Sequence, residues 1–503
     1  MKTCLIESTK ISRRSFLQAL GALTLSGSLA ACGGTGKAKS DRLAAGSLVY
    51  TPDEVVTVEF SDGGITVSPE DAAGLAVEET ALSVSGAGVY ALSGNCADGS
   101  VKVEAQTEDV VLLLDGLTLT SADTAPMVCG ESTGVTIAVV DGTENTLTDS
   151  EANDPDNAAD NENAEKAVVK CKDGSQVVLC GGGALTVNAR GKNGIKSGTA
   201  LDDRDASLTI RELTLNIEAL VNDAINAEQR LKVESGNLTI AAGEDAIHCD
   251  MELNIGAEGT TGPAITVSTC GEGLEGAVLN IHSGNMDITS TDDCLNAANS
   301  DLGDYAFEIN ISGGTIKAYS SEGDGFDSNG TLTITGGDIS VWTANAADNQ
   351  PLDADGRITI SGGTVLAAGG SAGMGFSISA SQPCVTFGGG RDSSLSLAGG
   401  EAFSIADESG KSVLDSTALC DAAFLFYSSP ALTAEGRYTV QPTVTATAKT
   451  GEADTQFGGN GGPGGNSGQR PDGMTPPDGQ LPQGQPPQSD GTTPPELPAA
   501  SSN

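Results

Sequence analysis

Apolar and polar residues alternate along this chain in short segments that follow glycine turns. Such alternation is typical of strands that have one buried face. Apolar residues do not recur at helical spacing over any useful length, and Gly and Pro interrupt the chain throughout. The clearest segments are SGNLTI from Ser235, SGNMDI from Ser283, SGGTIKA from Ser312, TGGDISV from Thr335 and SGGTVLA from Ser361. The pattern predicts an all-β protein built from short strands.

A second repeated segment follows these strands and reads Asp, any residue, apolar, Asn or Asp, small. It recurs as VNDAINA from Val221, GEDAIHC from Gly243, GEGLEG from Gly271, TDDCLNA from Thr291, EGDGFDS from Glu322 and NQPLDA from Asn349. Its apolar residue falls at Ile225, Ile247, Leu274, Leu295, Phe326 and Leu352. Repeats of the length that separates these apolar residues, with several strands in each repeat, are typical of solenoids. We therefore predict a single-stranded parallel β-helix over residues 48–400, followed by a C-terminal β cap over residues 401–450.

Such coils would stack equivalent carboxylates about 4.8 Å apart, the spacing of neighbouring strands. Two like charges that close repel by about 1 kcal/mol in water and by more near protein. Calcium neutralises such groups, because it takes about six to eight oxygen ligands from carboxylates, amides and carbonyls. The predicted Ca²⁺ ligands are Asp223, Asp245, Asp293, Asp324, Asp327 and Asp353, with Asn226 and Asn296 as neutral oxygen donors. The alternative is a metal-free ladder of hydrogen-bonded Asp and Asn turns.

Both ends of the chain differ from this repeated part. Residues 1–31 have the basic pair Arg13-Arg14 and an apolar run from Phe16 to Leu29 that is too short to span a membrane. The run ends in Leu-Ala-Ala-Cys, which resembles a bacterial lipobox in which Cys32 is lipidated. The basic pair resembles a twin-arginine export signal, with a general secretory signal as the alternative. We predict a tether over 32–47 and a disordered Gly/Pro-rich tail over 451–503.

The charge of the chain narrows its partners. The 503 residues include 68 Asp and Glu against 25 Lys and Arg, for a net charge of −43. Nucleic-acid binding draws on Lys and Arg, so this balance argues against it and favours divalent cations and an extracellular location. Nine cysteines remain after Cys4 and Cys32, an odd number, and we predict that most are buried small apolar residues rather than disulfide partners.

Several motifs resemble one family when they are taken in chain order. They are Gly142–Asp149 (GTENTLTD), Asn193–Ser197 (NGIKS) and the recurring Asp-x-apolar-Asn coils. Together they resemble the carbohydrate-binding lipoproteins of Gram-positive anaerobes. That resemblance implies a right-handed, polysaccharide-lyase-like β-helix that binds Ca²⁺ in its corner and binds cellulose or acidic sugars. His248 and Glu275 depart from the pattern, because they replace the usual Asn or Asp.

Three functions remain open at this stage. The first is a lipoprotein, anchored on the extracellular face of the cell membrane through Cys32, that binds polysaccharide (cellulose or a uronate-containing glycan) with the help of Ca²⁺. The second is a calcium-dependent polysaccharide lyase of the pectate type, for which Lys196 and Lys232 are the candidate bases. The third is a structural adhesin. No Lys lies in register beside Asp324 and Asp327, which favours binding over catalysis.

Overall fold

The computed structural model describes residues 43–299, 302, 305–344, 349–370, 377–389, 395–440 and 444–454. These residues are almost entirely strands, with two short 3₁₀ helices, η1 (Pro52–Glu54) and η2 (Glu151–Asn153). The prediction of an all-β protein is therefore confirmed. None of the helices in this described part is long or apolar enough to cross a bilayer. The predicted lipidation site Cys32 and residues 455–503 of the predicted tail lie outside the described residues, whereas residues 451–454 of that tail belong to the strand β40 (Lys449–Asp454).

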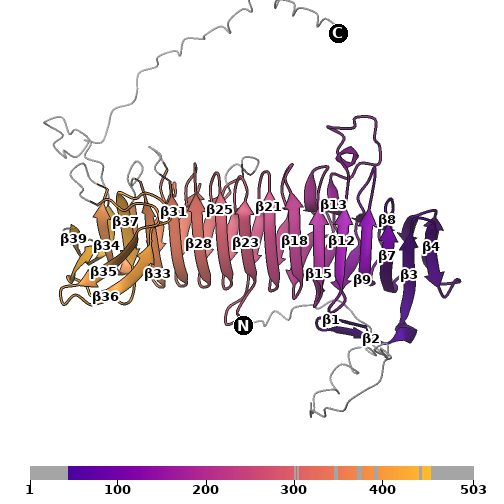
Figure 1. Ribbon diagram of the computed structural model, residues 1–503, viewed down its shortest axis with the longest axis horizontal. Coiled ribbons are helices and arrows are strands. Elements are labelled where there is room, and N and C mark those ends of the chain that lie inside the picture. Colours follow the sequence, from indigo (N-terminus) through magenta and orange to yellow (C-terminus); the bar gives the residue numbers. More distant parts are fainter. Residues whose placement is uncertain are drawn as a thin grey trace, which may run out of the picture. The chain divides into compact units, whose positions relative to one another are not determined.

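Most strands pair in parallel, and in the repeated part a strand commonly pairs with the strand three positions later in the chain. Figure 1 shows these strands lying side by side. Three ladders result. The first ladder consists of β6 (Ala81–Val84), β8 (Ser100–Val103), β10 (Met127–Cys129), β13 (Ala167–Cys171), β16 (Asn193–Ser197), β19 (Ile225–Ala227), β26 (Leu295–Ala297), β29 (Phe326–Ser328) and the first residues of β22 (Ile247–Ile255) and β24 (Leu274–Ile281).

The second ladder continues from the later residues of β22 and β24, so these two long strands bend from one ladder into the next. Its register breaks between Cys249 and Glu252, where β22 turns this corner. The strands are β3 (Val55–Ser61), β7 (Gly88–Cys96), β9 (Val110–Thr120), β11 (Gly134–Val139), β14 (Gln176–Gly181), β17 (Ser207–Arg211), β20 (Arg230–Val233), β27 (Glu308–Ile311), β30 (Thr331–Ile334), β32 (Ile358–Ile360) and β34 (Ser377–Gly388).

The third ladder contains the strands that follow the glycine turns noted in the sequence. Their alternating residues explain the pattern, because every second side chain is buried. The strands are β12 (Glu144–Thr148), β15 (Ala184–Asn188), β18 (Thr214–Ala219), β21 (Asn237–Ala242), β23 (Ala264–Thr269), β25 (Asn285–Ser290), β28 (Thr315–Ser320), β31 (Asp338–Thr343) and β33 (Thr364–Gly369).

Antiparallel strands flank the ladders at both ends. At the C-terminal end, β37 pairs with both β33 and β34, and a four-stranded sheet of β35, β36, β38 and β39 has its own apolar core around Trp342 and Phe403. The flanking strands are β1 (Leu43–Ala45), β2 (Leu48–Tyr50), β4 (Gly64–Ser68), β5 (Leu75–Glu78), β35 (Ala402–Asp407), β36 (Ser412–Thr417), β37 (Phe424–Ser428), β38 (Arg437–Val440), β39 (Val444–Thr447) and β40 (Lys449–Asp454).

The core between the ladders is a stack of aliphatic residues with few aromatic ones. The six apolar residues of the repeated segment occupy one column, as predicted: Ile225 pairs with Ile247, then Leu274, Leu295, Phe326 and Leu352 follow in register. All six are fully buried or nearly so. Identical or similar side chains therefore stack one above another, so the register of one coil sets that of the next.

Small residues precede this column because the chain turns tightly there. A Cβ atom at Gly325 would overlap the carbonyl oxygen of Pro351 and the side chain of Val341. A Cβ atom at Gly273 would overlap the carbonyl oxygen of Cys294 in the next coil. The close approach of neighbouring backbones keeps the flanking carboxylates of successive coils near one another.

Candidate functional site

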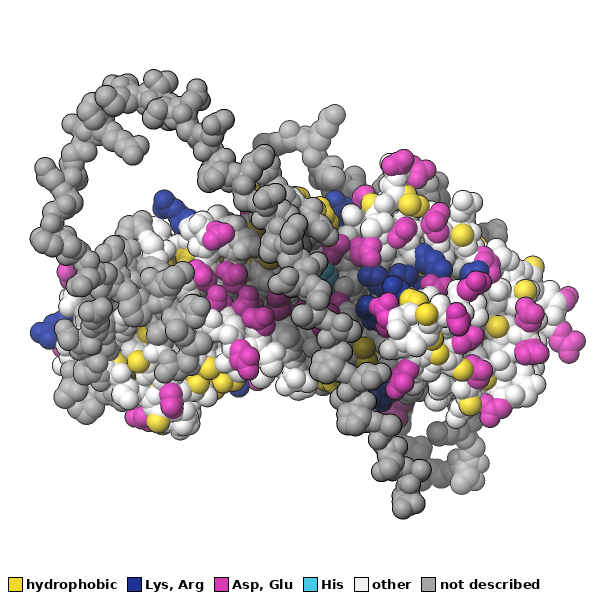
Figure 2. Space-filling model, turned by 90° about the horizontal axis from the view of Figure 1, so that it is seen from above, with side chains coloured by type: hydrophobic (Ala, Val, Ile, Leu, Met, Phe, Trp, Pro, Cys, Tyr) yellow, Lys and Arg dark blue, Asp and Glu magenta, His cyan; other side chains and the backbone are white. Residues whose placement is uncertain are grey.

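The outward residue after each buried apolar residue forms one polar column of the first ladder. In register, Asn226 is followed by His248, Glu275, Asn296 and Asp327. Asp353 continues this order, because it follows Leu352, which bridges to Phe326. We call this set the outer column. Figure 2 shows a band of Asp and Glu side chains on the face seen from above, with Lys and Arg side chains gathered beside it.

The residue two positions before each buried apolar residue forms a second polar column, the turn column. Its members are Asp223, Asp245, Glu272, Asp293, Asp324 and Gln350. Backbone amides of the next coil bind several of these carboxylates. Asp223 Oδ1 accepts from the amide of Asp245 at 3.2 Å, and Asp293 Oδ1 accepts from the amide of Asp324 at 2.6 Å. The acids are thus fixed by the same contacts that hold successive turns together.

The two columns meet most closely at Asp324, Asp327 and Asp353. One carboxylate oxygen of each lies within 4.8 Å of the other two, and all three side chains are half-buried. We call this group the triad. In the outer column Asn296 pairs with Asp327, and in the turn column the amide of Gln350 donates to Asp324 Oδ1 at 2.5 Å. Asn296 Oδ1 and Gln350 Oε1 are buried and accept no hydrogen bond within the described part of the chain.

Burial and neighbouring carboxylates disfavour the ionised form of the acids in and beside the triad. Burial raises the pKa of Asp324 and of Asp293 to about 7, and raises the pKa of Asp327 to about 6, with further contributions from neighbouring carboxylates. Hydrogen bonds from backbone amides oppose these shifts in part. A group of acids with raised pKa values retains protons near neutral pH unless a cation replaces them.

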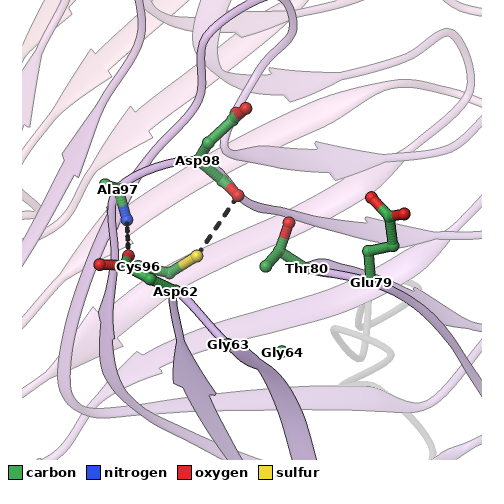
Figure 3. Close-up of a pocket in the computed structure, with 8 residues that line it drawn as sticks. All are labelled: Asp62, Gly63, Gly64, Glu79, Thr80, Cys96, Ala97 and Asp98. Carbon is green, nitrogen blue, oxygen red and sulfur yellow. Dashed lines mark hydrogen bonds between the residues drawn. The ribbon is translucent and has the colours of Figure 1, made fainter.

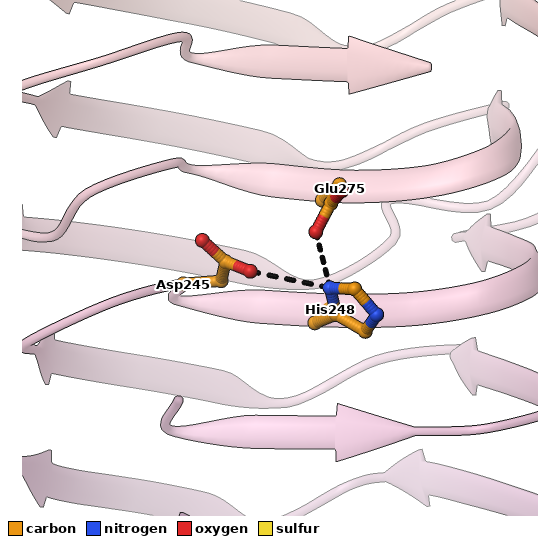
Figure 4. Close-up of side chains that lie close together, drawn as sticks. All are labelled: Asp245, His248 and Glu275. Atoms are coloured by element: carbon orange, nitrogen blue, oxygen red, sulfur yellow. Dashed lines mark hydrogen bonds and ion pairs between the residues drawn. The ribbon is translucent and has the colours of Figure 1, made fainter. Parts of the chain in front are cut away.

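A second group lies further along the same columns and already contains a cation. Asp245, His248 and Glu275 place one ligand atom each within 4.8 Å of the others (Figure 4). His248 Nδ1 contacts Asp245 Oδ2 at 3.2 Å and also contacts Glu275, and Nε2 contacts Asp250 at 2.7 Å. Burial lowers the pKa of His248, but these hydrogen bonds outweigh it and raise the pKa to about 12. An imidazolium therefore balances the carboxylates here.

The predicted ligands Asp223 and Asn226 are brought together, but their polar atoms are already used. Asn226 Nδ2 donates to Asp223 Oδ2 at 2.6 Å, and Asn226 Oδ1 accepts from Lys196 Nζ at 2.6 Å. The predicted ligands therefore fall into different settings. Asp324, Asp327 and Asp353 converge, Asp245 contacts a histidine, and the pair at Asp223 forms a hydrogen-bonded turn of the metal-free kind.

Sequence reasoning missed two residues of the turn column, Glu272 and Gln350. Burial raises the pKa of Glu272 to about 8, and Asn296 Nδ2 donates to its Oε2 at 2.9 Å. Both residues stand two positions before a buried apolar residue, where the other coils have Asp. The sequence aligns Leu274 and Leu352 with the other apolar residues, but a ligand set restricted to Asp and Asn leaves Glu272 and Gln350 out.

The acids that line a pocket elsewhere in the protein have a structural role. A pocket of about 500 Å³ near the β3–β4 turn is lined by Asp62, Gly63, Gly64, Glu79, Thr80, Cys96, Ala97 and Asp98 (Figure 3). Asp62 accepts from the amide of Ala97 at 2.8 Å, and Asp98 accepts from the amide of Ala122 at 3.0 Å, so these acids hold turns.

Aromatic and cysteine side chains also have mainly structural roles. Trp342 is fully buried and packs in the apolar core of the C-terminal sheet, where its ring centroid lies 6.1 Å from that of Phe403. Eight of the nine cysteines in the described residues are buried and none is in a disulfide, as predicted. The polar columns therefore carry the chemistry of the first ladder.

Comparison with known proteins places this arrangement in a family. The family described as carbohydrate-binding domain-containing protein matches residues 78–373 and 259–402. A carbohydrate-binding domain-containing protein of Acetivibrio thermocellus is 30% identical over 184 residues, which are 36% of this chain and 60% of that relative. The chain thus matches less than two thirds of that relative's length.

A solved structure, that of the polysaccharide lyase-like protein from C. thermocellum as a gadolinium derivative, has 20% identity and a TM-score of 0.34 over 61% of this chain and 96% of that one. The family match spans both polar columns and more than half of the chain. This chain belongs to the carbohydrate-binding domain-containing protein family.

Proposed function

We propose that this protein binds an extracellular polysaccharide, either cellulose or a uronate-containing glycan, through a calcium-dependent surface on the first ladder. We further propose that the three ladders form a right-handed single-stranded parallel β-helix. The parallel pairing of equivalent residues from coil to coil supports this architecture. The observation that carries the functional proposal is the convergence of the three carboxylates of the triad. Asn296 and Gln350, which adjoin Asp327 and Asp324, each hold a buried side-chain oxygen that accepts no hydrogen bond within the described residues.

The donor set of the triad fits Ca²⁺. Three carboxylates and the amide oxygens of Asn296 and Gln350 are hard oxygen ligands, and there is no nitrogen or sulfur among them. Buried polar atoms without hydrogen bonds are costly, so the two amide oxygens are a second reason to expect a cation. Bound Ca²⁺ would supply a positive charge that attracts sugar hydroxyls or a uronate carboxylate. Asp324, Asp327 and Asp353 would hold it.

A bound cation would also reduce the repulsion between this acidic protein and an acidic glycan. A protein with a net charge of −43 repels acidic glycans at low salt. A divalent cation held by the triad would offset two of its three negative charges, and a uronate carboxylate could then bind at the ion itself. The straight order of the column from Asn226 to Asp353 suits an extended polymer, because successive coils repeat about every 4.8 Å.

Membrane attachment is part of the proposal. Lipidation of Cys32 would place the protein on the extracellular face of the cell membrane, where polysaccharides are met. The Leu-Ala-Ala-Cys segment and the basic pair before it support this location. A structural adhesin would share this anchor, and it differs from the proposal in needing no glycan.

The lyase alternative is less favoured by the geometry. Lys196, the candidate base on the first ladder, stands five register steps from Asp327, which is about 24 Å at the usual strand spacing. The other candidate, Lys232, lies on the second ladder opposite Asn254. A base and a metal that act on one sugar must both lie within hydrogen-bond reach of it. The charges that most affect the pKa values of Asp293, Asp324 and Asp327 are those of other carboxylates.

Glycan binding with and without chelator tests the proposal. The purified protein is expected to be retained by insoluble cellulose or by immobilised polygalacturonate in calcium and to be released, at least in part, by EDTA. Unsaturated uronide absorbance should stay at background throughout. Retention by neither glycan in calcium would contradict the proposal, and steady growth of that absorbance would favour the lyase.

The pH dependence of stability follows from the raised pKa values. Without metal, Asp293 and Asp324 hold protons in the folded state up to about pH 7, whereas the ordinary pKa of an aspartate is 3.8. The folded protein then binds more protons than the unfolded one, so this contribution to stability is full below pH 4 and is lost as pH rises to about 7. Melting curves of the metal-free protein at pH 5 and pH 8 should show lower stability at pH 8. Added calcium should stabilise more at pH 8, where it competes with fewer protons.

A further inference from the structure

Two lysines face each other on the first ladder, beyond the histidine group and away from the triad. Lys170 of β13 pairs in register with Lys196 of β16, and both side chains are half-buried. Their strands lie about 4.8 Å apart, a spacing at which two ammonium groups repel each other. Figure 2 shows Lys and Arg side chains gathered beside the acidic band on one face. Because the lysines repel each other, nearby groups must stabilise the pair.

The neighbouring cations have carboxylate partners. Lys196 Nζ lies 2.8 Å from Glu228 Oε1, and Lys172 Nζ lies 2.7 Å from Glu165 Oε1. Lys170 differs, because no carboxylate of the described residues lies within ion-pair distance of its ammonium group. Burial and the charge of Lys196 lower the pKa of Lys170, while Glu228 and Glu165 oppose the shift from further away. A half-buried ammonium group without a partner is costly unless an anion from solution binds it.

We propose that Lys170 and Lys196 form a subsite for an oxyanion, a carboxylate or a sulfate ester, carried by the polysaccharide, and that this subsite works without calcium. The inference rests on the proposed function for its ligand class but uses different residues. The first ladder then has an anion subsite at Lys170 and Lys196 and a cation-dependent one at the triad. One extended acidic chain that runs along the outer column reaches both, whereas a neutral glycan gains nothing from the lysines.

Titration calorimetry with an oligogalacturonate in EDTA tests the subsite. Lys170→Gln is expected to weaken binding about tenfold, because one charge-assisted contact is lost, and Lys170→Arg should retain most of the affinity. The matched control is Lys317→Gln, which removes an exposed lysine of the third ladder that pairs with Asp287 at 3.3 Å. A cello-oligosaccharide and a dextran sulfate oligomer, titrated in parallel, separate a neutral glycan, a carboxylate and a sulfate.

The outcomes separate this inference from the proposed function. Binding of either anionic oligomer in EDTA that Lys170→Gln weakens and Lys317→Gln leaves unchanged supports the subsite. Equal affinity of Lys170→Gln and the unchanged chain overturns it, as does an equal loss in Lys317→Gln. Acidic-glycan binding that occurs only in calcium also overturns it while the proposed function stands. Absence of glycan binding in calcium and in EDTA removes both.

Discussion

Asp327→Asn is expected to make the protein more stable than the unchanged chain in chelator and less stable in calcium. In chelator the substitution removes one of three converging negative charges, so the repulsion within the triad falls. In calcium it removes a charged ligand, so the affinity for the ion falls. Ligand binding at about 100 times Kd stabilises a protein by about 2.7 kcal/mol, and most of that gain should disappear.

Melting curves of both proteins in calcium and in EDTA measure this reversal. The control is Asp287→Asn, which changes the same residue type at an exposed position of the third ladder. Its effect should be small and equal in both buffers, since exposed ion pairs contribute about 0–1 kcal/mol. If Asp327→Asn destabilises equally with and without calcium, the aspartate has a structural role and does not hold a metal.

His248→Gln is expected to destabilise the protein in chelator by about 2–3 kcal/mol. The imidazolium contacts Asp245, Asp250 and Glu275, and its loss leaves three half-buried carboxylates without a counter-charge. Removing one partner of a fully buried ion pair costs about 3–5 kcal/mol, and partial exposure reduces that figure. Calcium should restore part of the loss, because Asp245 and Glu275 then resemble the ligands of the triad.

Chemical denaturation in EDTA and in calcium checks this expectation, with His282→Gln as the matched control. His282 is the other histidine of the chain and contacts Ser312 Oγ at 3.0 Å in the turns that follow β24 and β27. Its replacement should change stability little in either buffer. An unchanged stability of His248→Gln in EDTA would show that the histidine does not balance these acids.

The repeated coils could be predicted from the sequence because they are encoded locally. Each coil has its own apolar residue between a small residue and a polar one, so Ile225 through Leu352 could be aligned without a structure. The polar residues align with the apolar ones because they lie next to them, or two positions before them, in the sequence. The prediction that distant acids come together followed from this alignment and needed no knowledge of the loops.

The separate settings of the predicted ligands could not be read from the repeat. Whether an aspartate accepts a hydrogen bond or faces another carboxylate depends on its neighbours in the adjacent coils. Asn226 is engaged because Lys196 lies one coil away, whereas Asp327 faces other carboxylates because Asp324 and Asp353 lie close to it. The acids also divide between two columns, whereas the prediction placed them in one. The register between neighbouring coils decides such contacts. That register is hard to read from the sequence, because the number of residues between equivalent positions varies from coil to coil.

The most direct test of the account is a calcium titration of the metal-free protein followed by calorimetry. We expect saturable binding of at least one Ca²⁺ near neutral pH, with tighter binding at pH 8 than at pH 5 and a large loss of affinity in Asp327→Asn. No saturable binding at either pH, together with identical melting curves in calcium and EDTA, would contradict it.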